Sequence, residues 1–336
     1  MQLERIDPRD LDLDTADEMA EVERAWLTES GLPLPRQSGP SKLKALQHGS
    51  DGRPSAGLWL AREGAALAGY VVAHLPVEDN TDSAHLRGVV HPSFRRQGTG
   101  RALVDAAVDL AHSRGRTKVY AGAFRADSSG KALEAMGFSS HGLGTNAIRR
   151  VDLHATPPER WQRLYDEASA HATDYELTHQ VGPTPDELLA DMVTLHAAIN
   201  DAPLDDPEAE DDHWDVDRVR AYDRAMAARR QTVHRVLARH RTTGEWAGLS
   251  ILCIDEFSPA IAFQEDTSVV RTHRGHRLGQ LMKADMLRRI NYERPEVAAT
   301  DTWNATSNHH MIAVNERLGA TVVAEIDTYR LRTERP

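Results

Sequence analysis

The sequence has very little cysteine, few aromatic residues and no long apolar run. Cys253 is the only cysteine among 336 residues, so no disulfide can form within the chain and an intracellular protein is indicated. It lies in the apolar stretch 249–254, which favours a buried core residue over a nucleophile. No apolar run approaches the roughly 20 residues of a membrane span, and the first residues lack the pattern of a signal peptide. We therefore expect a cytoplasmic protein that binds no membrane.

Positive charge is also in short supply. The chain has 51 acidic and 40 basic residues, a formal net charge of −11, which argues against general binding to nucleic-acid backbones. An acidic chain suits a cationic substrate, although solubility explains the same excess. The acidity is concentrated in the run 205–212, which is typical either of a solvated loop or of a lip that attracts an amine.

Several catalytic signatures are missing. The 17 histidines include no His-Glu-x-x-His pattern, so we expect no metal site. A Gly-Lys-Ser/Thr turn for nucleoside triphosphates and a Gly-x-Ser-x-Gly turn for serine hydrolysis are both absent. These absences exclude the commonest signatures of metal-dependent, phosphate-hydrolysing and serine-hydrolase chemistry.

The sequence does contain an internal repeat. Each half is predicted to form a strand, an Arg-x-x-x-x-Gly turn, an amphipathic helix, a strand, a short helix and a glycine. From Arg95 to Gly137 there are 42 positions, and from Arg274 to Gly319 there are 45. Such agreement in order and spacing indicates two similar domains.

The length of the chain supports the same conclusion, because 336 residues suffice for two domains. We expect an N-terminal domain at 1–155 and a C-terminal domain at 174–336. A helical linker at 156–173, opened by a Pro-Pro pair, is expected to join them.

The two turns have the features of an anion site. Each follows a Val-Val pair and opens a helix, where successive N–H groups and the helix dipole favour a ligand such as pyrophosphate. Arginine at the edge adds charge-assisted contacts. Neither turn has the glycine spacing of a dinucleotide-binding turn. The first turn comprises Arg95, Arg96, Gln97, Gly98, Thr99 and Gly100, and the second comprises Arg274, Gly275, His276, Arg277, Leu278 and Gly279.

These motifs resemble the GCN5-related N-acetyltransferase (GNAT) family, in the tandem form known from actinobacteria. The family turn, Gln/Arg-x-x-Gly-x-Gly/Ala, follows a splayed strand and cradles the pyrophosphate of acetyl-CoA. The resemblance covers 58–153 and 233–332. It implies an α/β fold of two tandem GNAT domains, each a mixed, mostly antiparallel sheet with a splayed central strand flanked by helices. It also implies acetyl-CoA as co-substrate, direct acetyl transfer to a primary amine of a small molecule, and a monomer or homodimer.

The resemblance also suggests cofactor-binding residues beyond the turns. It assigns the oxyanion donor to the backbone of Val269 or Val270, with Val90 as the first-half counterpart. The family asparagine corresponds to Asn308 in the second half and to alanine in the first. Neither half keeps the family tyrosine that reprotonates the departing thiolate, since leucine and Asn315 stand there. Water or another residue must then supply the proton.

Candidate bases are confined to the second half. Glu265 and Asp266 precede the splayed end, and strand alternation predicts that one of them at most faces the acceptor; we favour Glu265. An exposed strand end is the alternative. His309, or its neighbour His310, is a further acid–base candidate or else a surface histidine.

The corresponding first-half residues, Leu86 and Arg87, are poor bases. We therefore expect a catalytic C-terminal domain and a degenerate N-terminal one. A non-catalytic acyl-CoA-binding protein or sensor is the alternative function.

Overall fold

The computed structural model describes residues 1–202, 206 and 208–333, so Asp205 of the acidic run lies outside the described residues. The described chain divides into two compact units. The first comprises residues 1–146, together with 206, 208–210 and 323–333, and the second comprises 147–202 and 211–322. Each unit is a sheet covered by helices on both faces.

The sheet of the first unit has the order β1-β2-β3-β4-β5-β12. Neighbours pair antiparallel except β4 and β5, which are parallel. Its elements are β1 (Gln2–Ile6), α1 (Leu13–Ser30), α2 (Gly39–His48), β2 (Gly57–Glu63), β3 (Ala66–His74), β4 (Ser83–Val90), α3 (Thr99–Ser113), β5 (Lys118–Phe124), α4 (Ser129–Ala135) and β12 (Thr321–Arg332).

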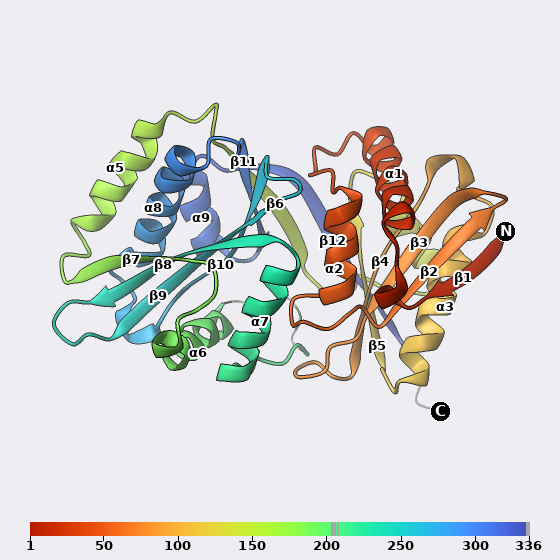
Figure 1. Ribbon diagram of the computed structural model, residues 1–336, viewed down its shortest axis with the longest axis horizontal. Coiled ribbons are helices and arrows are strands. Elements are labelled where there is room, and N and C mark those ends of the chain that lie inside the picture. Colours follow the sequence, from red (N-terminus) through yellow and green to blue (C-terminus); the bar gives the residue numbers. More distant parts are fainter. Residues whose placement is uncertain (203–205, 207, 334–336) are drawn as a thin grey trace. The chain divides into compact units, whose positions relative to one another are not determined.

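Alternation along β2 builds two core layers in the first unit. Leu58 and Leu60 pack under α1 and α2, while Trp59 and Ala61 pack under α3. Figure 1 shows α1 and α2 together on one side of this sheet. The helix α3 begins directly after Gly98, whose φ of 85° is left-handed. The first turn is therefore positioned by a buried, amphipathic helix.

The sheet of the second unit has the order β6-β11-β10-β9-β8-β7. Strands β10 and β11 pair in parallel, whereas β7 with β8, β8 with β9, and β9 with β10 pair antiparallel. Core clusters place α5, α8 and α9 on one side and α6 and α7 on the other (Figure 1). Its elements are β6 (Thr145–Asp152), α5 (Pro158–Ser169), β7 (Tyr175–Val181), α6 (Leu189–Ala197), α7 (Val216–Ala228), β8 (Gln231–His240), β9 (Trp246–Asp255), β10 (Ile261–Val269), α8 (Leu278–Glu293), β11 (Ala299–Ala305) and α9 (His309–Leu318).

The compact units do not follow the expected domain boundaries. Most of β6, from the N-terminal half of the sequence, belongs to the second unit, and most of β12, from the C-terminal end, belongs to the first. The expected linker helix is α5, which packs on α8 in the core of the second unit. Each half of the sequence thus contributes one strand to the other unit.

Candidate active site

Two neighbouring parallel strands separate in each unit. β10 pairs with β11 only over Ile261–Gln264, although β10 continues to Val269. β4 likewise pairs with β5 only from Ser83 to Leu86 and continues to Val90. Backbone groups beyond the last pair face the gap rather than a neighbouring strand. Both units therefore contain a splayed central strand.

The two turns share one backbone conformation, although glycine and arginine occupy its two left-handed positions in opposite order. The second and fourth residues of each turn are left-handed, with φ of 61° at Arg96 and 85° at Gly98 in the first, and 87° at Gly275 and 55° at Arg277 in the second. Alternation of left-handed and ordinary residues makes a concave row of N–H groups that binds anions. Arg277 therefore replaces a glycine in the sequence without changing the shape of the turn.

The first arginine of each turn binds the end of the splayed strand. The Arg274 Nε donates to the Val269 carbonyl at 3.1 Å, and its Nη2 lies 2.6 Å from the Asp201 carboxylate. The Arg95 Nε donates to the matching carbonyl of β4 at 3.4 Å, and Arg95 also forms an ion pair with Glu29. These two arginines brace the turns, so their charge is already partnered.

The remaining turn residues differ in what they present to a ligand. Arg96 and Arg277 are exposed and have no ion-pair partner within the described chain. Thr99 and Leu278 are buried at the helix starts, so only their backbone N–H groups can contact an anion. The free positive charge at each turn therefore comes from its left-handed arginine.

Backbone alternation distinguishes Val269 from Val270. The Val270 N–H donates to a carbonyl of β9 at 2.9 Å. Bonded and non-bonded pairs alternate in an antiparallel ladder, so Val269, opposite Gly248, directs its own N–H toward the gap beside β11. His91 donates to β3 at 2.9 Å in the same way and leaves Val90 facing the first gap. Of the two valines predicted as oxyanion donors, Val269 is therefore the one whose N–H faces the gap.

A bulge in β10 carries the two candidate carboxylates. The register shifts between Gln264 and Thr267, so Glu265 and Asp266 together oppose one residue of β9. A bulge bends its strand and re-aims side chains. The regular alternation that would place the two carboxylates on opposite faces is therefore interrupted at this point.

Glu265 interacts with a residue of α7, and Asp266 with the segment that leads into this helix. The Tyr222 hydroxyl donates to the Glu265 carboxylate at 2.6 Å. Burial, together with the negative charges of Glu265 and Asp212, raises the pKa of Asp266 to about 6. A carboxyl group with this pKa changes protonation close to neutral pH, as a general base requires.

Tyr222 also contacts the single cysteine. Its hydroxyl lies 3.6 Å from the Cys253 sulfur, and burial raises the pKa of that thiol well above its usual value. Cys253 is buried in the core beneath α6 and α7, as the sequence predicts.

The first unit has no such arrangement on its splayed strand. The β3–β4 ladder runs without a register shift from His85 to Val90. Leu86 is buried in the core under α3, and Arg87 occupies the next position. The bulge and its carboxylates belong to the second unit.

Two polar residues near α9 form hydrogen bonds within the second unit. The Asn308 side chain accepts the Met311 N–H at 3.2 Å and so caps the helix. His309 and His310 are exposed at the helix start. Asn315 is buried, and its amide donates to the Asn304 side chain at 2.7 Å. None of these side chains contacts Glu265 or Asp266.

The acidic run is divided between the two units. Asp206 accepts the Tyr120 hydroxyl at 2.6 Å and lies 3.5 Å from Arg330, while Glu208 lies 3.4 Å from Lys118. All of these residues belong to the first unit. Only Asp212 is close enough to influence the bulge, so the described part of the run does not form one acidic lip.

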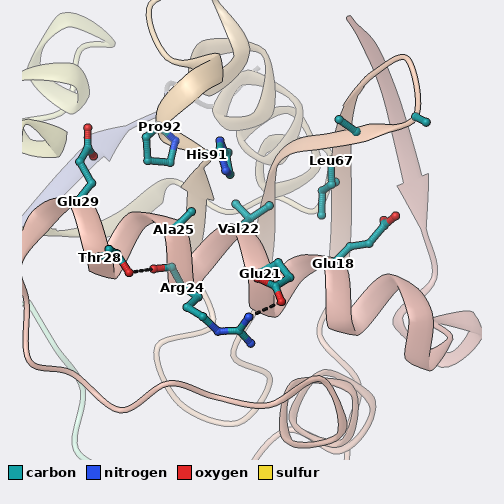
Figure 2. A pocket seen from close by; sticks show the side chains of 12 residues that line it. Glu18, Glu21, Val22, Arg24, Ala25, Thr28, Glu29, Leu67, His91 and Pro92 are labelled. Carbon is teal, nitrogen blue, oxygen red and sulfur yellow. Dashed lines mark hydrogen bonds and ion pairs between the residues drawn. The ribbon is translucent and has the colours of Figure 1, made fainter.

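A cavity lies elsewhere, beside α1 in the first unit. It has a volume of about 670 Å³, and Figure 2 shows its glutamates along α1 with His91 and Pro92 across from them. No residue of the first turn lines it. Its carboxylates are all neutralised, Glu18 by Arg62, Glu21 by Arg24 and Glu29 by Arg95. Among the described residues, the cavity therefore presents no unpaired carboxylate to a ligand.

Sequence reasoning missed Tyr222 and Lys283, and it placed Asp212 in the acidic run without predicting its proximity to the bulge. Tyr222 and Asp212 reach the bulge from α7 and the segment before it, a proximity that no local pattern indicates. Lys283 lies on α8 and is 4% exposed. A lysine adjoining the apolar stripe of a predicted helix was the one available signal.

The described chain offers neither a membrane-spanning helix nor a metal-binding cluster. No helix in the ranges 1–202 and 208–333 combines the length and apolarity needed to cross a membrane. Within the same ranges no three His, Cys, Asp or Glu side chains are grouped as a metal ion would require.

Comparison with known proteins agrees with this geometry. Residues 19–138 match the model of the acetyltransferase (GNAT) family. The sequence matches no curated protein. A tandem GNAT protein from the clavulanic acid biosynthesis pathway is 26% identical, with a TM-score of 0.80 over 98% of both chains.

Two more distant structures share the fold. A GCN5-related N-acetyltransferase from Sphaerobacter thermophilus is 16% identical, with a TM-score of 0.68 over 99% of this chain and 96% of its own. A GNAT-family acetyltransferase from Colwellia psychrerythraea is 13% identical, with a TM-score of 0.56 over 99% of this chain and 100% of its own. The predicted fold class, two tandem GNAT folds, is confirmed. Residues 19–138 thus match the acetyltransferase (GNAT) family, and the chain as a whole is an acyltransferase that resembles a tandem GNAT protein.

Proposed function

We propose that the second unit transfers an acetyl group directly from acetyl-CoA to a primary amine of a small molecule. The observation that carries this proposal is the β10 bulge, which sets Glu265 and Asp266 a few residues before the Val269 N–H and the second turn. The regular β4 ladder leaves the first unit without an equivalent. The first unit then serves to bind acetyl-CoA weakly or to support the structure.

Each part of the site has one task in this mechanism. The second turn and Arg277 hold the pyrophosphate, and the Val269 N–H donates to the carbonyl oxygen as it becomes an oxyanion. Asp266 takes the proton from the attacking amine, because its raised pKa matches the working pH. Glu265, held by Tyr222, keeps a negative charge beside Asp266. This assignment replaces Glu265 with Asp266 as the favoured base.

The charges around the bulge suggest the class of acceptor. The charges of Glu265 and Asp212 both act on Asp266, and three neighbouring carboxylates favour a cation. A small amine with a second positive charge, such as a polyamine or an aminoglycoside-like compound, fits this field. Its distal ammonium group would be attracted by the carboxylates that are not acting as base.

The test is an assay of thiol release from acetyl-CoA over a panel of neutral and cationic amines, with the acetylated product identified by mass spectrometry. We expect turnover with cationic amines, and a loss of about 10²-fold or more in Asp266→Asn with acetyl-CoA affinity retained. Acetyl-CoA binding without thiol release from any amine would instead favour the acyl-CoA sensor.

A further inference from the structure

The second unit encloses a small cavity where β10 and β11 begin to separate. Its wall includes Gln264 and Thr302, the last paired residues of the two strands, with Lys283 from α8 and Asn315 from α9. Its volume is about 10 Å³, room for about one water molecule. The helices α8 and α9 lie on the face of the sheet opposite α7, from which Tyr222 reaches Glu265.

Lys283 is an isolated base inside this wall. It is 4% exposed and has neither an ion pair nor a hydrogen bond to any residue of the described chain. Burial lowers its pKa to about 7, because an unpaired ammonium is costly away from water. Lys283 therefore exchanges a proton near neutral pH, unlike an exposed lysine.

The cavity also touches the position from which the family tyrosine is missing. Asn315 stands there, and its amide is already donated to Asn304. A carboxamide does not release a proton at neutral pH. Among the residues that line the cavity, Lys283 is the only one that titrates.

We propose that Lys283 is the general acid that protonates the departing thiolate of CoA. This inference rests on the proposed function of the second unit. When the tetrahedral intermediate collapses, the carbon–sulfur bond breaks with its electron pair on sulfur, and a proton passes from the Lys283 Nζ to that sulfur. CoA leaves as the thiol, and the neutral amine of Lys283 regains its proton from solvent. Asp266, reached from the opposite face, receives the proton of the acceptor amine.

The first unit provides an independent comparison. The position equivalent to Lys283, nine residues after the first arginine of the turn, is Val104, and the position equivalent to Asn315 is Leu133. Both side chains pack in the core with α3. The unit without a base therefore also lacks the acid, as expected if the two groups act in one reaction.

The experiment compares Lys283→Met with a matched variant, Val104→Met, in the full chain. We expect Lys283→Met to lower kcat by about 10²-fold or more, with the Kd for CoA by calorimetry changed less than twofold, and Val104→Met to leave both unchanged. The ratio of wild-type to Lys283→Met turnover should fall as the pH rises through about 7, since the wild type loses its acid there. Because both proteins use the same acceptor amine, the ratio removes the effect of the acceptor's own titration.

A second variant, Lys283→Arg, tests whether a folding defect explains the loss of activity. It keeps the charge but holds its proton at neutral pH, so it should be as slow as the methionine variant while remaining folded by circular dichroism. Equal turnover of wild type and Lys283→Met would overturn the assignment of Lys283 and leave the transferase function standing. A slow variant whose ratio to wild type is independent of pH would also overturn it. Absence of thiol release by the wild type with every amine would remove the proposed function, and this inference with it.

Discussion

Arg96 and Arg277 show how one backbone conformation is encoded by two sequences. Each turn needs two left-handed residues, and each uses glycine for one and arginine for the other, in reverse order. A non-glycine residue in this region costs roughly 1 kcal/mol. The sequence predicts both turns from their glycines and flanking helices, but it presents Arg277 as a departure from the family pattern. The backbone shows that it is an equivalent solution.

The pH dependence of turnover is predicted at the level of two side chains. Asp266 must be deprotonated to accept a proton, and its pKa is raised to about 6, so kcat/KM should fall as the pH drops through about 6. Glu265→Gln removes a neighbouring negative charge and lowers the pKa of Asp266, which should move this acidic limb to lower pH. Steady-state profiles between pH 5 and 8 measure the shift.

The control is Glu245→Gln, which changes an exposed carboxylate outside the bulge and should leave the limb in place. The contrary outcome is an acidic limb of the pH profile that keeps its position in Glu265→Gln and persists in the residual activity of Asp266→Asn. That result would show that another group is the base.

The start of α8 is the element that should bind pyrophosphate. An added Cβ at Gly279 would meet nothing closer than the Thr267 side chain at 3.9 Å, and at Gly100 nothing closer than Val90 at 3.6 Å. Alanine therefore fits both helices without a ligand and should stabilise each by up to about 1 kcal/mol. In Gly279→Ala the methyl group would stand where the backbone approaches phosphate.

We expect Gly279→Ala to raise the KM for acetyl-CoA about tenfold or more without lowering the melting temperature. Gly100→Ala is the matched control and should leave the KM unchanged, because the proposed function places the reaction in the second unit. The reverse pattern would assign the chemistry to the first unit. Differential scanning fluorimetry and steady-state kinetics provide the two readings.

Substitution of Asn308, at the start of α9, distinguishes a helix-capping role of this residue from a role in cofactor binding. Asn308 caps this helix through the Met311 N–H, so Asn308→Ala should lower the free energy of unfolding by about 1 kcal/mol. Asn308→Asp restores an acceptor at the same position and should recover the stability. If the side chain acts only as a cap, the Kd for acetyl-CoA stays within about twofold of wild type. A large loss of affinity in a stable Asn308→Asp variant would instead support contact with the cofactor.

The sequence predicts elements better than it predicts their partners. Helix periodicity and the Val-Val pairs locate the two turns, because those signals are local. The bulge in β10 depends on pairing with β9, and the burial of Lys283 depends on packing against β10 and α9. Such contacts join segments far apart in the chain, so neither feature is visible in the sequence around it.

At the scale of the whole molecule, the internal repeat predicts two similar units but not which strands each contains. The repeat places the last strand of each half after its short helix and glycine. Both halves end in a strand at this position, so the repeat alone does not say which sheet each strand joins. The structure pairs β12 with β5 over Ile326–Arg332, so the end of the chain completes the first unit.

Removal of residues 323–336 should therefore unfold the N-terminal part of the protein. β5 would lose its antiparallel partner, and the first core would lose Tyr329, which is buried among residues of β2, β3 and α3. Amide hydrogen exchange should show loss of protection in β5 and α3, with β8 and β9 still protected. A chain shortened only by residues 334–336 is the control and should keep the full pattern. Adding a peptide of residues 323–333 should restore protection in β5; if β5 stays protected in the truncated chain without the peptide, β12 is dispensable to the first unit.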